Sequence, residues 1–316
     1  MAAQEWAPII QALTAGESLD YGQSYWLMDQ VMSGELGEAR LASFLTAMAI
    51  KGATVDEIHG LADGMQDHAA HVDLPSRALD IVGTGGDGYK TVNISTMSAI
   101  VLAAMGIPLV KHGNRAATSK SGSADVIEAL GVNLDLDADA LRRVFDEVGI
   151  AFLFANKMHP SMRFAAPVRR ALGFPTAFNV LGPLTNPARV QACAIGASRE
   201  ENARLMAGVY ASRGLSALVF RGANTGLDEL TTTDANQVWN AAVASDVLSG
   251  GGADSVRDAV ALNVGAGILA WEGLENPVTQ ADFERRMRGA VERALGVLAD
   301  GSGARLIERW VAASNE

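Results

Sequence analysis

The stretch that decides the fold, residues 79–130, reads LDIVGTGGDGYKTVNISTMSAIVLAAMGIPLVKHGNRAATSKSGSADVIEAL. It opens with LDIV, which predicts a short and mainly apolar strand, and breaks at once into the loop GTGGDG at 83–88. Glycines leave backbone N–H groups accessible and let a ligand approach the main chain closely. NIST at 93–96 then predicts a helix start, where free N–H groups and the helix dipole favour an anion. We interpret this segment as a phosphate cradle.

A second predicted strand, at 107–110, is followed by the cationic loop KHGNR at 111–115, and a polar loop to Ser123 leads into another helix. Both loops follow strand ends, the side on which open α/β sheets bind ligands. A glycine loop alone is common, and NIST alone fits ordinary helix capping. Their combination with the cationic loop favours phosphate binding. The spacing matches neither the P-loop nor the dinucleotide-binding fingerprint.

Composition narrows the class of protein. A chain of 316 residues, 49% of them hydrophobic, can bury a large core as one big domain or two unequal ones. The single cysteine, Cys193, excludes a disulfide framework and a cysteine metal site. A net charge of −11 argues against nucleic-acid or anionic-membrane partners. The start MAAQE lacks the features of a signal peptide, and no run of residues is long and apolar enough to span a membrane, so we expect a cytoplasmic protein.

Residues 1–76 predict helices and no strand. Apolar residues recur at helical spacing over 9–13, 25–32 and 41–50, and Thr54 with Glu57 forms a capping box that opens a fourth helix. So small a bundle buries little by itself. We therefore expect it to pack on a partner, either the rest of this chain or a second copy.

From residue 79 the pattern changes to strands separated by helices, which predicts parallel pairing. The fold class we expect is α/β: a large domain with a mainly parallel sheet flanked by helices, plus a small all-helical domain, with a ligand cleft between them. Further strands are predicted at 150–154, 191–196 and 217–220. The Ala/Ser/Gly-rich span from 240 to 253 predicts an exposed loop, and helices follow at 256–271, 282–298 and 305–311.

The motifs GTGGDG, NIST, KHGNR and SGSADVIEALG together resemble the anthranilate phosphoribosyltransferases of tryptophan biosynthesis, which belong to the nucleoside phosphorylase and phosphoribosyltransferase-like enzymes. The resemblance covers residues 25–233 and resumes in the C-terminal helices. It implies a helical domain of residues 1–76 joined by about 160–188, and a large α/β domain of 77–159 and 189–316. It also implies a homodimer through the N-terminal helices.

The activity implied by the resemblance is transfer of the 5-phosphoribosyl group from 5-phosphoribosyl-1-pyrophosphate to the amine of anthranilate, with release of pyrophosphate. Asp228 and Glu229, adjacent acids after a predicted strand, fit ordinary turn residues by themselves. They also suit Mg²⁺, which prefers carboxylate oxygens and would offset the charge of the leaving group. The resemblance assigns this pair to Mg²⁺, with Ser95 as a further ligand.

The resemblance places phosphoribosyl pyrophosphate on Gly83, Gly86, Asp87, Thr91, Asn93, Ile94, Ser95, Thr96, Lys111, His112, Gly113, Asn114, Arg115, Ala116, Ala117, Thr118, Ser119 and Ser123. Lys111 is expected to act with the acid pair on the charge of the departing group. The anthranilate contacts that the resemblance implies are Gly83, Asn114, His159 and Arg169. A guanidinium fork at Arg169 suits a carboxylate, although a solvated helix face would also explain this residue. His159 also fits a loop cap.

Other functions stay open at this point. A pyrimidine nucleoside phosphorylase shares the fold but uses free phosphate and needs no metal-bound pyrophosphate. A related aminobenzoate is another possible substrate. A non-catalytic nucleic-acid binder would carry a basic face, which the net charge does not favour. The chain is also shorter between 239 and 258 than the family pattern.

Overall fold

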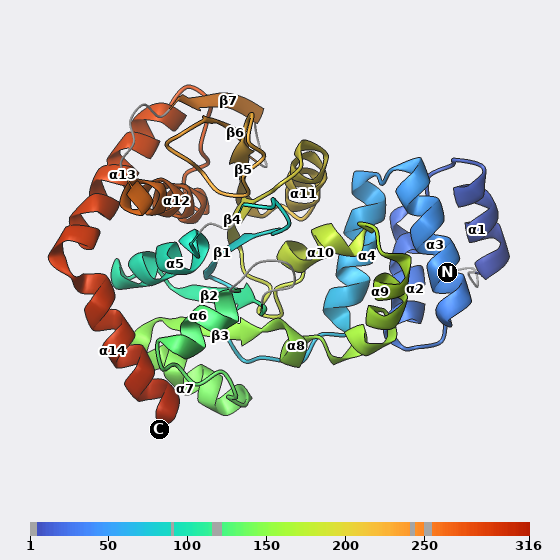
Figure 1. The fold of residues 1–316 in the computed structure, drawn as a ribbon, viewed down its shortest axis with the longest axis horizontal. Helices are drawn as coiled ribbons and strands as arrows, with labels where there is room; N and C mark the ends of the chain where they lie inside the picture. The colour runs from blue at the N-terminus through green and yellow to red at the C-terminus, as the bar shows by residue number, and fades with distance from the viewer. Residues whose placement is uncertain (1–4, 90–91, 116–121, 241–243, 250–254) are drawn as a thin grey trace. The chain divides into compact units, whose positions relative to one another are not determined.

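The computed structural model describes residues 5–89, 92–115, 122–240, 244–249 and 255–316. The chain forms two compact units (Figure 1). The helical unit comprises Met1–Ala70 and Asn156–Pro187, and the α/β unit comprises His71–Ala155 and Ala188–Glu316.

The helical unit consists of short helices. They are α1 (Trp6–Thr14), α2 (Tyr21–Met32), α3 (Glu38–Lys51), α4 (Val55–Asp67), the 3-10 helix η1 (Pro160–Phe164), α9 (Ala166–Leu172) and α10 (Phe178–Leu184). The turn α8 (Ala155–Met158) precedes η1. The four predicted N-terminal helices are confirmed. So is the capping box, because the Thr54 amide donates to Glu57 at 2.7 Å and the Glu57 amide donates to Thr54 Oγ1 at 3.3 Å.

Helices α2 and α4 pack so closely that two positions of α4 require glycine. A Cβ on Gly60 would lie 2.3 Å from the carbonyl oxygen of Tyr21, and one on Gly64 would lie 2.9 Å from that of Tyr25. The Tyr21 hydroxyl also donates to Asp63 on α4 at 2.8 Å. This contact makes α2 and α4 the central pair of the unit.

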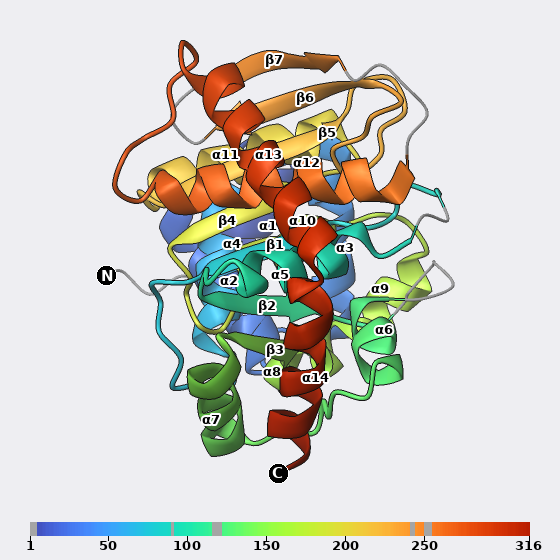
Figure 2. The same ribbon diagram turned by 90° about the vertical axis from the view of Figure 1, so that its left-hand side faces the viewer.

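The α/β unit contains a seven-stranded sheet in the order β3-β2-β1-β4-β5-β6-β7, which Figure 2 shows from one face. Its strands are β1 (Leu79–Gly83), β2 (Leu109–Gly113), β3 (Ile150–Phe154), β4 (Ala192–Gly196), β5 (Ser216–Gly222), β6 (Ala235–Asn240) and β7 (Ala244–Ser249). Strands β1 to β5 pair in parallel, as predicted, whereas β6 and β7 are antiparallel. The α/β class with a mainly parallel sheet and a separate helical bundle is therefore confirmed.

Helices cover both faces of this sheet. On one face lie α5 (Ile94–Ala104) and α12 (Ser255–Glu272), with α13 (Phe283–Asp300) and α14 (Ser302–Asn315) outside them (Figure 2). The helix α11 (Glu200–Ser212) packs on β5 and β6, α7 (Ala138–Val148) packs on β3, and α6 (Ser123–Ala129) follows the cationic segment. Within the described chain, no helix is both long and apolar enough to cross a membrane.

Two predictions of secondary structure were wrong. The expected loop at 240–253 contains β7, which pairs with β6. An antiparallel edge pair is held by backbone hydrogen bonds, so a composition of small residues did not reveal it. The second strand spans Leu109–Gly113 rather than 107–110, so part of the expected cationic loop lies inside the sheet.

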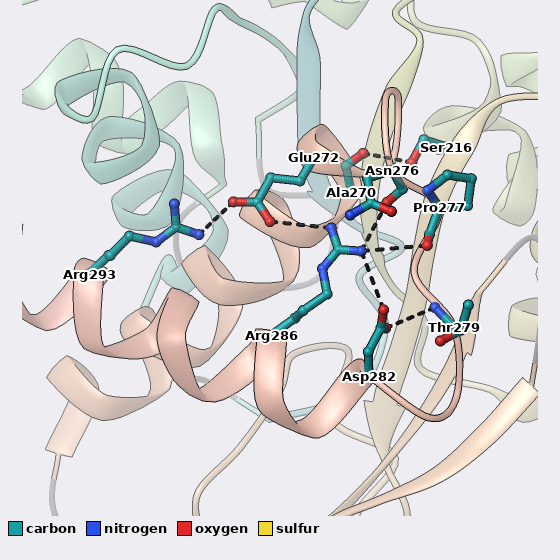
Figure 3. Close-up of polar contacts among 9 residues, drawn as sticks. All are labelled: Ser216, Ala270, Glu272, Asn276, Pro277, Thr279, Asp282, Arg286 and Arg293. Carbon is teal, nitrogen blue, oxygen red and sulfur yellow. Dashed lines mark hydrogen bonds and ion pairs between the residues drawn. The ribbon is translucent and has the colours of Figure 1, made fainter.

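The C-terminal helices are fastened to one another by an ion network (Figure 3). Glu272, the last residue of α12, accepts from Arg286 at 3.3 Å and from Arg293 at 2.7 Å on α13. Arg286 also donates to the carbonyl oxygens of Asn276 and Pro277, at 2.9 and 3.5 Å. The guanidinium of Arg286 therefore ties the connection between the two helices to α13.

Candidate active site

The acid pair, Asp228 and Glu229, lies over the carboxyl ends of β1 and β4. Gly83 and Gly196 stand opposite each other in the register of these strands. A Cβ on Gly83 would lie 2.4 Å from Asp228 Oδ2, and one on Gly196 would lie 1.7 Å from the Asp228 carbonyl oxygen. Two glycines in register thus leave the space that Asp228 occupies. The Gly85 amide then donates to Asp228 Oδ2 at 2.6 Å.

Two buried asparagines hold the backbone that follows the acid pair. Asn263 of α12 accepts from the Leu230 amide at 3.2 Å and donates to the Leu230 carbonyl oxygen at 2.9 Å. Asn236 of β6 does the same for Thr231, at 2.9 and 2.8 Å. Each side-chain amide thus serves both polar groups of a residue that no strand pairs. This fixes the direction in which the acid pair leaves the sheet.

The acid pair is buried, and this governs its ionisation. Asp228 and Glu229 are 8% and 7% exposed. Burial raises the pKa of Asp228 to about 7, and the neighbouring Asp87 carboxylate adds to this shift. Burial also raises the pKa of Glu229 well above its usual range, with the Asp228 charge as a further cause and Lys111 opposing it. A cation at this place would favour the ionised form of both acids.

Lys111 lies in the middle of β2 and not in a loop, which corrects the prediction for the cationic segment. Its side chain is 1% exposed, and its ammonium donates to the Ile81 carbonyl oxygen and, at 3.4 Å, to Ser95 Oγ. Burial lowers the pKa of Lys111, while the nearby carboxylates raise it. His112 and Gly113 complete the strand, and His112 is 5% exposed. The strand continues because β3 pairs with it along five residues.

The first turn of α5 faces the acid pair. The Ser95 amide donates to Glu229 Oε1 at 3.2 Å. Asn93 is the N-cap residue, yet its side chain makes no capping hydrogen bond, so the alternative of ordinary capping does not account for it. Ile94 and Thr96 are buried, and the Thr96 hydroxyl has no hydrogen-bond partner in the described part of the chain. These features suit a helix start that binds an anion.

Hydrogen bonds hold the first residues of the glycine loop in place. Ser198, after β4, donates from its amide to Thr84 Oγ1 and from its hydroxyl to the Gly85 carbonyl oxygen, both at 3.1 Å. Gly85 and Gly86 have φ of +67° and +79°, which favour glycine. Asp87 accepts from the amide of Tyr89 at 3.0 Å. The loop therefore turns sharply above the acid pair.

The rest of the cationic segment runs from β2 to α6. The Arg115 guanidinium donates to Asp125 at 3.0 Å and to Glu128 at 2.8 Å, both on α6. The Ser123 hydroxyl donates to the carbonyl oxygen of Asn114, whose side chain is exposed. The expected ligand residues Thr91, Ala116, Ala117, Thr118 and Ser119 lie outside the described residues.

The remaining anthranilate candidates belong to the helical unit. His159 is 4% exposed, and burial lowers its pKa to about 4 although it hydrogen-bonds to the Thr185 backbone, so the imidazole is neutral at pH 7. The Arg169 guanidinium lies 5.0 Å from the centre of the Phe178 ring, and burial lowers its pKa. No carboxylate among the described residues pairs with Arg169. Its neighbour Arg170 is exposed.

Models of known families and individual known proteins match this chain. Models of a glycosyl transferase family match the chain in two parts, the helical bundle domain at residues 7–69 and the a/b domain at 75–246. The anthranilate phosphoribosyltransferase of Arthrobacter sp. (strain FB24) is 48% identical, over 98% of this chain and 96% of the relative. That of Nocardia farcinica (strain IFM 10152) is 44% identical, over 97% and 99%. The chain belongs to the anthranilate phosphoribosyltransferase family.

Solved structures agree with this assignment. The crystal structure of anthranilate phosphoribosyltransferase from Thermus thermophilus superposes with a TM-score of 0.87 at 36% identity, over 97% of this chain and 99% of that one. The enzyme from Saccharomyces cerevisiae, solved in complex with PRPP and Mg, is 23% identical with a TM-score of 0.78, over 98% of both chains, and supports the fold alone.

Sequence reasoning missed several residues of this candidate site. Gly196, Ser198 and the two asparagines at 236 and 263 touch the acid pair, its backbone or the glycine loop. Gly196, Ser198 and Asn263 act on segments distant in sequence, and Asn236 acts on a backbone five residues away, so no local motif marks them. The nearest signal is a glycine that ends an apolar strand, as Gly83 does.

We predict that Gly196→Ala disables the enzyme and lowers its melting temperature. The added methyl group displaces Asp228, and misplacement by about 1 Å costs on the order of 100-fold in rate. Steady-state transferase assays and circular dichroism measure the two effects. Gly289→Ala is the matched control, because a Cβ there meets nothing within 4 Å. Equal activity of the two variants would contradict the seating of Asp228 by glycine.

We also predict that His159 makes the free energy of unfolding fall as the pH falls. Its pKa of about 4 in the folded protein lies below the usual 6.5, so the unfolded chain takes up the proton first. The contribution of the neutral His159 side chain to the free energy of unfolding is complete above pH 6.5 and is lost as the pH falls towards 4. Between pH 7 and pH 5 the loss is about 2 kcal/mol. Urea unfolding at both pH values should show a smaller loss for His159→Gln. The same loss in both proteins would refute this role.

Proposed function

We propose that the site around the acid pair carries the family's reaction, transfer of the 5-phosphoribosyl group from 5-phosphoribosyl-1-pyrophosphate to the amine of anthranilate in tryptophan biosynthesis. The activity follows from membership in the anthranilate phosphoribosyltransferase family. The observation that supports this location of the active site is a pair of buried carboxylates between a glycine loop and a helix start. Donors for phosphate and acceptors for a cation meet there.

The residues present fit Mg²⁺. Asp228 and Glu229 are buried, and burial raises the pKa of both carboxyl groups, so a bound cation would favour their ionised forms. In the described ranges no group of three or more His, Cys, Asp or Glu forms a complete metal site, so substrate oxygens and water would have to supply the remaining ligands. We propose that the acid pair and the Ser95 hydroxyl hold the ion. When bound, Mg²⁺ would offset charge on the pyrophosphate.

The chain's own groups then bind and align the substrates. Amide N–H groups of the glycine loop and of the first turn of α5 would bind phosphate oxygens. The bond from ribose C1 to pyrophosphate breaks while the bond from C1 to the anthranilate nitrogen forms, and the amine gives up one proton. An aromatic amine is neutral at pH 7 and keeps its lone pair, so no strong general base is needed. Alignment of the amine with C1 is the main contribution of the protein.

We propose Gly83, Asn114, His159 and Arg169 as anthranilate contacts, with Arg169 on the carboxylate. A half-buried guanidinium that lacks an acidic partner among the described residues favours an anionic ligand. The neutral imidazole of His159 would accept or donate one hydrogen bond without adding charge. The homodimer through the N-terminal helices and the cytoplasmic location stay predictions.

The test of the acid pair is loss of anthranilate fluorescence on adding 5-phosphoribosyl-1-pyrophosphate, with and without Mg²⁺. The wild type should show Mg²⁺-dependent loss. Asp228→Asn/Glu229→Gln should slow it by about 100-fold or more, because a preorganised electrostatic contribution is removed. Glu292→Gln, an exposed acid of α13, should keep the wild-type rate. A Mg²⁺-independent wild type, or an active double variant, would refute the proposed metal site.

For Arg169 we expect a change confined to one substrate. Arg169→Met should raise KM for anthranilate by about tenfold or more, because a hydrogen bond to a charged group is lost, and should leave KM for the phosphoribosyl donor unchanged. For Arg169→Lys, the KM for anthranilate should lie between those of the wild type and of Arg169→Met, since lysine keeps the charge but loses the fork. Arg170→Met is the control on the same helix. Equal effects at 169 and 170 would contradict the assignment.

A further inference from the structure

Strands β1 and β2 are joined in an unusual way. Within these described strands, they pair at a single position, Leu79 opposite Leu109. The neighbouring parallel pairs, β1 with β4, β2 with β3, and β4 with β5, each run over five positions. The ladder thus opens at the end of the sheet where the two ligand loops begin. Buried backbone groups must find other partners there.

Two charged side chains provide the next links between the strands. Asp80 Oδ1, from β1, accepts from the His112 amide of β2 at 3.2 Å. In the other direction, the Lys111 ammonium of β2 donates to the Ile81 carbonyl oxygen of β1. Asp80 is 0% exposed and Lys111 is 1% exposed. A carboxylate and an ammonium therefore replace part of the ladder, each reaching from its own strand to the backbone of the other.

Opposite charges also lie near one another where β1 and β2 meet. Two carboxylates, Asp80 and Glu229, act on the Lys111 ammonium. The mechanism above has uses for Glu229 but none for Asp80, which lies inside β1 and before the glycine loop. A buried charge is strongly unfavourable without a partner of opposite sign. Asp80 therefore supplies a negative charge near Lys111 that lies outside the acid pair.

These links connect the three elements that carry the expected ligand residues. Lys111 also donates to Ser95 Oγ at the start of α5. The chain of contacts runs from Asp80 through the β2 backbone to Lys111, and from there to α5. The position of Asp80 consequently sets the spacing between the glycine loop after β1 and the segment after β2.

We propose that Asp80 is a positioning residue of the transferase: its carboxylate replaces the backbone ladder between β1 and β2 and fixes Lys111 and the start of α5 in the geometry that binds the phosphoribosyl donor. This rests on the proposed function for the place where the donor binds. Asp80 touches no substrate and acts through Lys111 and the β2 backbone.

The test compares Asp80→Asn with the wild type in steady-state assays that vary each substrate. The amide keeps an oxygen acceptor for the His112 amide but removes the charge. We expect KM for the phosphoribosyl donor to rise by about tenfold or more, as for outer-shell partners of other sites, with KM for anthranilate unchanged. Asp80→Glu, which keeps the charge, should recover part of the affinity. An unchanged donor KM, or equal rises for both substrates, would overturn the proposal.

Cys193→Ala is the matched control. Cys193 is buried in β4 and stands opposite Asp80 in the register of β1 and β4. A merely structural disturbance at this depth of the sheet should lower the melting temperature in this variant and leave the donor KM as it was. A donor KM that rises equally in Cys193→Ala would show that packing alone is responsible, and would overturn the proposal.

If Asp80→Asn does not fold, the double variant Asp80→Asn/Lys111→Met removes the carboxylate and the ammonium together. Calorimetric titration with the donor and Mg²⁺ should then show binding at least about tenfold weaker than in the wild type. Wild-type affinity in the double variant would overturn the proposal. Turnover by the wild type tests the proposed function separately, so that failure of one is distinguished from failure of the other.

Discussion

The contact between the Asp228 backbone and the ends of β1 and β4 is the constraint on which the site depends. No side chain fits between them, since a Cβ on Gly196 would lie 1.7 Å from the Asp228 carbonyl oxygen. The acid pair is therefore held by main-chain geometry, and the two asparagines that follow it also act on the main chain. The supports of the acid pair are thus closely packed strand ends and two buried side-chain amides, which hold its backbone in one position.

Burial of charged groups at this site has an energetic cost. The buried Lys111 ammonium interacts with two buried carboxylates, those of Asp80 and Glu229. Burial is the main cause of the raised pKa values of Asp228 and Glu229, and neighbouring carboxylates add to both shifts. A divalent cation would favour the ionised forms of Asp228 and Glu229. A ligand that binds only the folded protein would also stabilise it.

Much of the architecture was predictable because it rests on periodic patterns. The four N-terminal helices, the parallel strands from β1 to β5 and the helix start at Asn93 follow from the spacing of apolar residues and from local capping chemistry. The acid pair and the glycine loop were identified in the same way, as polar segments that follow apolar strands. Strands β6 and β7 were not, because the backbone ladder of an edge hairpin makes few demands on side chains.

Most residues that sequence reasoning misplaced or missed share one property: their partners are backbone groups of distant segments. Lys111 was placed in a loop because a lysine inside a buried parallel strand violates the usual pattern, yet the Ile81 carbonyl oxygen and the Asp80 charge make the strand possible. Asn263 satisfies a residue thirty-three positions away. Local rules fail where a fold gives up regular pairing to hold charge, and such failures mark functional sites. In this sheet, the place where the local rules fail is the interrupted hydrogen-bond ladder between β1 and β2.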